Sequence, residues 1–129
     1  AALAERAWET ARFLRLDHLI DNPATALSGG QKKLLEIGRA LMAEPRLVLL
    51  DEPTAGVNPT LQNEIGERLL ELPRRGITVL LIEHDMGFIA RLCDPVIVMA
   101  EGQVLTEGTF DQVRNDHRVR EAYLGRRTA

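Results

Sequence analysis

The chain has 129 residues, of which 45% are hydrophobic and 27% charged, and its formal net charge at pH 7 is -3. This composition is typical of a globular domain with its own core, and the slight negative charge excludes a broad basic surface for nucleic acid. The single cysteine, Cys93, excludes a disulfide within the chain. No apolar run reaches the ~20 residues that a membrane-spanning helix needs.

The first third of the chain predicts two helices. The apolar spacing of residues 3–20 is that of an amphipathic helix, and the segment Asp21-Asn22-Pro23 breaks it. Ser28 then fits a helix N-cap, and Gln31 completes a Ser-x-x-Gln capping box. We expect this second helix to run to about Ala43.

The middle of the chain predicts a β-α-β unit. Residues 47–50 are all aliphatic, as in a parallel strand that is buried on both faces. Asn58 and Pro59 are typical of a helix start. Residues 78–82 form a second continuous apolar strand.

The remaining segment predicts shorter elements. Asp85 can cap a short helix, and the runs 96–99 and 103–106 flank an Ala-Glu-Gly turn that is typical of a β-hairpin. Thr109 or Asp111 then begins a charged helical tail. The predicted fold class is therefore α/β, with a mainly parallel sheet and an antiparallel hairpin.

A glycine pair at the start of the second helix is suited to meet a phosphate. The segment Ser28-Gly29-Gly30-Gln31 combines the unpaired N–H groups and the positive dipole of a helix N-terminus with two residues that have no side chain. The same residues can serve only as a cap and a turn, and spacing alone leaves both interpretations open.

Acidic and imidazole side chains follow the two predicted strands. Ligands of open α/β sheets bind at the carboxyl ends of the strands, where Asp51 could hold Mg²⁺ and Glu52 could polarise an attacking water. His84 ends the second strand and could contact a γ-phosphate. Alternatively, the acids are a solvated strand end and the histidine is structural.

These motifs, taken in order, resemble those of ABC ATPases. Leu27–Gln31 resembles the signature motif, Leu47–Glu52 the Walker B strand, Gly56–Pro59 the D-loop, and His84 the switch histidine. Other stretches are similar to the ATP-binding subunits of branched-chain amino acid importers, namely Gln31–Ile37, Ala55–Pro59, Ile82–Met86 and Ala122–Gly125. Asn58, where many ABC proteins have Asp, agrees with that subgroup.

The resemblance implies a role for each motif in a head-to-tail dimer. Ser28, Gly29, Gly30 and Gln31 would bind the ATP that is held by a partner subunit, Asp51 would hold Mg²⁺, and Glu52 and His84 would be catalytic. Gly56, Val57 and Asn58 would lie at the dimer interface. The implied partners are a second ATP-binding subunit, membrane permease subunits and, indirectly, a solute-binding protein, which places the subunit at the cytoplasmic face of the membrane.

A phosphate-binding P-loop is not found in this sequence. It has no Gly-x-x-x-x-Gly-Lys-Ser/Thr motif, and no glycine is followed by lysine. The chain also begins without Met, inside a helical pattern, so we expect the C-terminal half of a P-loop NTPase of ABC type. We expect residues 1–45 to end a helical subdomain, 46–108 to complete the nucleotide-binding core and 109–129 to form a helical tail.

The expected function is ATP hydrolysis that drives the uptake of branched-chain amino acids, with the isolated chain inactive. Two alternatives keep the ATPase and change its task, to urea or amide import or to lipopolysaccharide export. A third is a stand-alone half-domain that binds a partner without catalysis.

Overall fold

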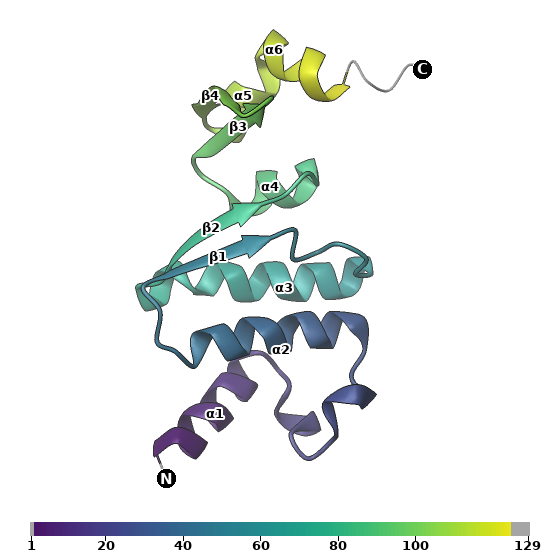
Figure 1. Cartoon of the computed structure of the whole chain (residues 1–129), viewed down its shortest axis with the longest axis vertical. Coiled ribbons are helices and arrows are strands. Elements are labelled where there is room, and N and C mark those ends of the chain that lie inside the picture. The colour runs from purple at the N-terminus through teal and green to yellow at the C-terminus, as the bar shows by residue number, and fades with distance from the viewer. Residues whose placement is uncertain (1, 125–129) are drawn as a thin grey trace. The chain divides into compact units, whose positions relative to one another are not determined.

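The computed structural model describes residues 2–124 and divides into two compact units, Ala1–Glu83 and His84–Ala129 (Figure 1). Among the residues described, no helix is both long and apolar enough to cross a membrane. The α/β fold class is confirmed, with a parallel strand pair in the first unit and an antiparallel pair in the second. The division into residues 1–45, 46–108 and 109–129 stays a prediction.

The first helix is shorter than predicted. α1 spans Ala2–Phe13 rather than residues 3–20, because the chain reverses at Arg15, which has φ 56°. The Leu16 N–H donates to the carbonyl of Ala11 at 2.8 Å, which is the long hydrogen bond of a Schellman C-cap. Glycine usually provides this cap, so an arginine there conceals the helix end from sequence analysis. Two 3₁₀ turns lead on to the next helix, at Asp17–Leu19 and Ala24–Ala26.

A β-α-β unit follows the second helix, as predicted. The elements are α2 (Gly29–Leu41), β1 (Leu47–Asp51), α3 (Pro59–Glu71) and β2 (Thr78–Ile82), with a 3₁₀ turn at Pro73–Arg75 before β2. The strands pair in parallel, with Leu47 opposite Thr78 and Asp51 opposite Ile82. The carboxyl ends of both strands therefore lie together.

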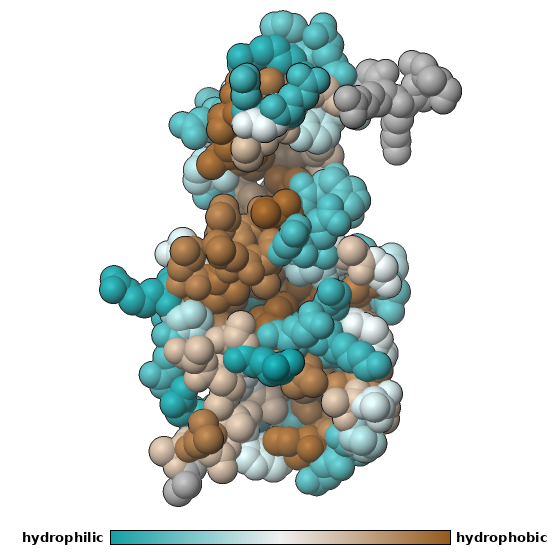
Figure 2. Space-filling model, in the orientation of Figure 1, coloured by the Kyte–Doolittle hydropathy of each residue, from teal (hydrophilic) through white to brown (hydrophobic). Residues whose placement is uncertain are grey.

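The β1–β2 sheet is covered on one face by the described residues and open on the other. Val48 is 5% exposed, whereas its neighbour Leu49 is 66% exposed. The open face consists of Leu47, Leu49, Leu80 and Ile82, each at least 52% exposed, and Figure 2 shows a hydrophobic surface over the place of these strands. The prediction of strands buried on both faces is wrong for the first unit by itself, because no described segment of that unit covers the second face. The buried core of the first unit includes Phe13, Leu14, Leu16, Leu34, Ile37, Val48, Ile65, Leu69 and Leu72.

The second unit is built from short elements. They are α4 (Met86–Leu92), β3 (Val96–Ala100), β4 (Gln103–Gly108), α5 (Phe110–Asn115), α6 (His117–Val119) and a π-helical turn at Arg120–Leu124. The predicted hairpin is confirmed, and its two turn residues, Glu101 and Gly102, both have positive φ. The predicted helical tail is interrupted at Asp116, which caps α6. The similarity noted at Ala122–Gly125 extends in part outside the described residues.

Candidate functional site

The predicted site residues of the first unit come from element ends that lie on one side of it. Figure 1 shows the carboxyl ends of β1 and β2 on the same side as the N-terminal ends of α2 and α3, because both helices run back against the strands. This is the side of an α/β sheet where ligands bind. The element ends on this side carry Ser28–Gln31, Asp51, Glu52 and Gly56–Asn58.

The start of α2 carries the predicted capping box. The Gln31 N–H donates to Ser28 Oγ at 3.2 Å, and the Ser28 N–H donates to Gln31 Oε1 at 2.9 Å. The cap role of these two side chains is therefore confirmed. Neither hydrogen bond uses the N–H groups of Gly29 and Gly30, which belong to the same helix terminus.

The two glycines of this motif differ in their surroundings. A Cβ added to Gly30 would lie 2.3 Å from Leu61 Cδ1 and 3.0 Å from Leu61 Cβ, so the Leu61 side chain or the two helices would have to shift. A Cβ added to Gly29 would meet no atom of the described residues within 4 Å beyond its own helix and chain neighbours. Helix packing thus explains Gly30, while Gly29 leaves open space at an exposed helix start.

The start of α3 lies against the start of α2 through the same contact. Leu61 is in the first turn of α3, and its N–H donates to Oδ1 of Asn58, the N-cap, at 3.0 Å. The predicted signature motif and the predicted D-loop are therefore neighbours in space.

Asp51 and Glu52 lie at the end of β1, and both are exposed. The Glu52 N–H donates to the carbonyl of Ile82 at 2.8 Å, which continues the pairing with β2 by one residue. Glu52 has φ 46°, in the left-handed region. For a non-glycine residue this conformation costs about 1–2 kcal/mol, so it persists because surrounding contacts impose it.

The loop after Glu52 is held by a contact that sequence analysis missed. Thr54 is buried, with 5% exposure, and its Oγ1 donates to Glu83 Oε1 at 2.6 Å. The Thr54 N–H donates to the same oxygen at 3.3 Å. The two residues are far apart in the sequence, and the sequence signal available was a carboxylate directly after an apolar strand.

The predicted D-loop is also held from α3. Gln62 Nε2 donates to the carbonyl of Val57 at 2.9 Å, and Gly56 turns the chain with φ 70°. This conformation favours glycine. The Gln62 contact is a side-chain to backbone hydrogen bond, and the spacing of residues in the sequence revealed neither it nor the Glu83 contact.

His84 is the first residue of the second unit and is exposed. The next residue, Asp85, caps α4 as predicted, with the Phe88 N–H donating to its Oδ1 at 2.9 Å. The assignment of His84 to the catalytic site stays a prediction.

The donor chemistry of the strand end suits Mg²⁺ that arrives with a nucleotide. Residues 2–124 hold no group of three or more His, Cys, Asp or Glu side chains that could bind a metal ion by themselves. Mg²⁺ commonly takes one or two carboxylates and completes its shell with waters and substrate phosphates. The exposed carboxylate of Asp51 meets that requirement.

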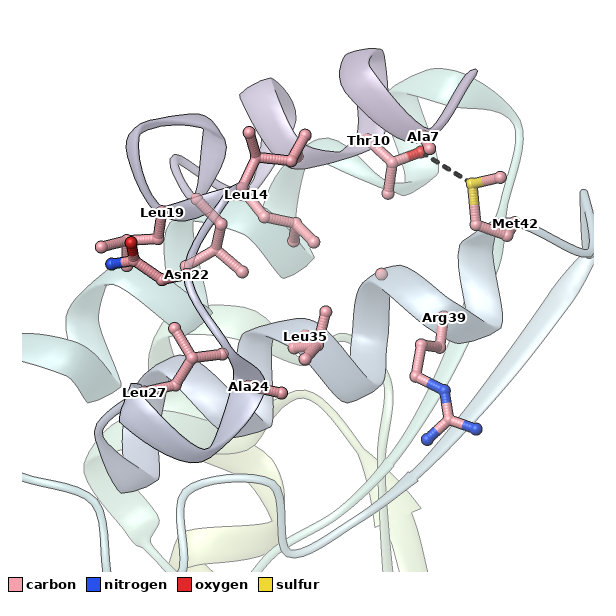
Figure 3. A pocket seen from close by; sticks show the side chains of 14 residues that line it. Ala7, Thr10, Leu14, Leu19, Asn22, Ala24, Leu27, Leu35, Arg39 and Met42 are labelled. Atoms are coloured by element: carbon pink, nitrogen blue, oxygen red, sulfur yellow. Dashed lines mark hydrogen bonds between the residues drawn. The ribbon is translucent and has the colours of Figure 1, made fainter. Parts of the chain in front are cut away.

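A separate hollow of about 220 Å³ lies between α1, α2 and the segment that joins them (Figure 3). Leu14, Leu19, Leu27 and Leu35 line it, and Thr10 Oγ1 contacts Met42 Sδ at 3.5 Å across one end. Its lining is mainly apolar and includes none of the predicted site residues. It does not offer acid–base chemistry.

The parallel strands, with helices that run back against them and acidic residues at the strand ends, are typical of α/β domains that bind ligands at that side. Comparisons with known proteins give the family. Residues 2–55 match the family model described as ABC transporter, and residues 103–129 match that described as branched-chain amino acid ATP-binding cassette transporter. The chain belongs to the ATP-binding subunit family of ABC transporters.

Individual relatives support the same assignment. The chain is 44% identical over 123 residues to the probable branched-chain amino acid transport ATP-binding protein LivG of Archaeoglobus fulgidus, covering 95% of this chain and 48% of that protein. It is 38% identical to the lipopolysaccharide export system ATP-binding protein LptB of Haemophilus influenzae, covering 94% of this chain and 50% of that protein.

Among solved structures, the chain is similar to the ADP conformation of MJ1267, an ATP-binding cassette of an ABC transporter. The TM-score is 0.89 at 43% identity, and the match covers 97% of this chain and 51% of that structure. The chain thus spans about half the length of the relatives it matches.

Proposed function

We propose that this chain supplies the signature, Walker B, D-loop and switch-histidine part of an ATP-hydrolysing ABC subunit. The observation that carries the proposal is the common side of the first unit, on which two acidic strand-end residues and two helix N-termini lie. Two carboxylates alone would repel a triphosphate. Helix N-termini and a Mg²⁺ ion offset that repulsion, so the combination suits a magnesium nucleotide.

The residues of the strand end have distinct roles in this proposal. Asp51 would hold Mg²⁺, which neutralises phosphate charge when bound. Glu52 would accept a proton from the attacking water, and His84 would contact the γ-phosphate. General-base catalysis of this kind contributes about 10²–10⁴-fold to a rate.

The signature residues would act on a nucleotide held by another subunit. Ser28, Gly29, Gly30 and Gln31 would close over the γ-phosphate of ATP on a second ATP-binding subunit, and Gly56, Val57 and Asn58 would meet that subunit beside them. The open space at Gly29 supports this, since a phosphate needs close approach to the helix N–H groups. The two ATP-binding subunits would work with permease subunits at the cytoplasmic face of the membrane.

The transported solute is proposed from the end of the chain. The match of residues 103–129 to the branched-chain amino acid model favours uptake of branched-chain amino acids. Export of lipopolysaccharide is the alternative, because LptB proteins are also among the relatives. Uptake of labelled leucine by vesicles that contain the complete transporter separates the two, and ATP-dependent uptake is the expected result.

A pair of variants in the full-length subunit tests the ATPase proposal. Glu52→Gln should abolish turnover but leave ATP binding intact, so that ATP accumulates and holds a closed dimer. Ser28→Arg should block the partner's γ-phosphate, so that ATP binds each monomer without a stable dimer. Size-exclusion chromatography with Mg-ATP is the measurement. Dimers of both variants would remove Ser28 from the interface, and wild-type turnover in Glu52→Gln would remove Glu52 from catalysis.

The isolated 129-residue chain should not turn over ATP. Phosphate affinity in this family of sites rests mainly on the P-loop and its lysine, and that motif is not in the sequence. Turnover of Mg-ATP by the isolated chain above that of its Glu52→Gln variant would contradict this expectation.

A further inference from the structure

The contact between Glu83 and Thr54 joins the end of β2 to the loop that follows the proposed general base. Glu83 Oε1 accepts both the hydroxyl of Thr54, at 2.6 Å, and its backbone N–H, at 3.3 Å. A hydrogen bond from a hydroxyl to a carboxylate is among the stronger types. Because Thr54 is buried, loss of the acceptor would leave polar atoms without a partner in a site that water reaches poorly.

Thr54 lies where two consecutive turns meet. The Ala55 N–H donates to the carbonyl of Glu52 at 3.1 Å, and the Val57 N–H donates to the carbonyl of Thr54 at 3.1 Å. Thr54 is therefore inside the turn that begins at Glu52 and at the start of the turn that enters the D-loop. A contact that fixes Thr54 restrains the backbone on both sides of it.

We propose that Glu83 is a positioning residue for Glu52. Its carboxylate holds Thr54, and Thr54 holds the turn that keeps Glu52 in the left-handed conformation. The Glu52 N–H, bonded to the carbonyl of Ile82, fixes the other side of the same residue, so Glu52 is restrained by the last residue of β2 and by the residue that follows it. This inference rests on the proposed function, in which Glu52 is the general base.

Steady-state kinetics of the full-length subunit test the proposal. Glu83→Ala should lower kcat about 10- to 100-fold and leave KM for Mg-ATP nearly unchanged, because misplacing a catalytic group affects the chemical step more than binding. Glu83→Gln, which keeps an acceptor oxygen, should lose less. Thr54→Val should show the same loss of kcat, whereas Thr54→Ser, which keeps the hydroxyl, should retain most of the wild-type kcat. The Thr54→Val/Glu83→Ala double variant should lose little more kcat than the worse of the two single variants.

Two controls separate positioning from general damage. Glu67→Ala removes an exposed glutamate of α3 whose carboxylate lies 3.4 Å from Arg68, and it should leave kcat unchanged. Backbone hydrogen exchange of Glu83→Ala should be faster at Ala55 and Val57 than in the wild type, while the β1 and β2 amides keep their protection.

Each result counts for or against the assignment. A loss of kcat at constant KM together with faster exchange at Ala55 and Val57 supports it. Wild-type kcat in Glu83→Ala, with Glu52→Gln inactive, overturns the role of Glu83 alone, and so does a kcat loss that scales with loss of folded protein. Wild-type turnover in Glu52→Gln overturns the proposed base, and the role of Glu83 fails with it.

Discussion

The two faces of the β1–β2 sheet carry the same kinds of side chain and differ in what covers them. On one face Val48 is 5% exposed and packs in the core of the first unit, whereas on the other Leu49 is 66% exposed. The two glycines at the start of α2 differ in the same way, since Gly30 meets Leu61 and Gly29 meets open space. Residue type alone therefore does not tell which positions pack inside this chain and which are left open at its surface.

The largest effect is expected from placing a charge on the covered face. Val48→Asp should unfold the first unit, because an unpaired buried carboxylate costs several kcal/mol. Leu49→Asp, one residue along the strand, should change the free energy of unfolding little. Urea denaturation followed by circular dichroism checks the pair.

The same pair tests the open face. An exposed apolar strand surface promotes association, so we expect the wild-type chain alone to be poorly soluble or self-associated and Leu49→Asp to be less so. Light scattering after size exclusion is the measurement. Equal destabilisation by both variants, or a wild-type chain that is a monodisperse monomer, would contradict the contrast between the faces.

A smaller effect is expected at the glycine pair. Gly30→Ala should lower the free energy of unfolding by about 1–3 kcal/mol, which is typical of overpacking, because its Cβ would overlap Leu61. Gly29→Ala should leave stability unchanged or raise it slightly, since alanine favours helix over glycine. Chemical denaturation of the full-length subunit checks both.

Dimerisation driven by nucleotide distinguishes the two glycines in the opposite way to stability, because here the effect is expected at Gly29. If Gly29 makes room for a partner's phosphate, Gly29→Ala should weaken the dimer formed with Mg-ATP in a Glu52→Gln background while stability is retained. Wild-type dimerisation of that variant would show that the open space at Gly29 has another purpose.

The features that sequence analysis predicted correctly depend on neighbours within a few residues. Each of four helix caps accepts a hydrogen bond from the backbone N–H three positions ahead, namely Ser28, Asn58, Asp85 and Thr109. The local sequence is therefore enough to predict each cap. Likewise, the continuous apolar runs identified both strands of the parallel pair.

The features that sequence analysis missed depend on distant contacts or on uncommon backbone conformations. The end of α1 is set at Arg15, whose left-handed conformation its residue type does not indicate. The bond between Thr54 and Glu83 joins residues that are 29 positions apart. Whether a strand face is covered depends on segments elsewhere, so the aliphatic run could not distinguish Val48 from Leu49.

The smallest effect is expected at the Asp116 cap of the second unit, where the partner is two residues away. The Asp116 carboxylate accepts hydrogen bonds from the Arg118 side chain at 2.7 and 3.1 Å and from its N–H at 2.9 Å. These bonds, the side-chain ones first, lower the pKa of Asp116 from 3.8 to about 2. A lowered pKa means that the folded state favours the carboxylate, so its small contribution to stability is present above pH 3.8 and is lost as the pH falls toward 2.

The Asp116 carboxyl resonance in NMR should therefore titrate with a midpoint near 2, and Arg118→Ala should return that midpoint toward 3.8. Because the Asp116 side chain is partly exposed, added salt should weaken the effect. A midpoint near 3.8 in the wild type would show that this cap does not hold Arg118 in solution.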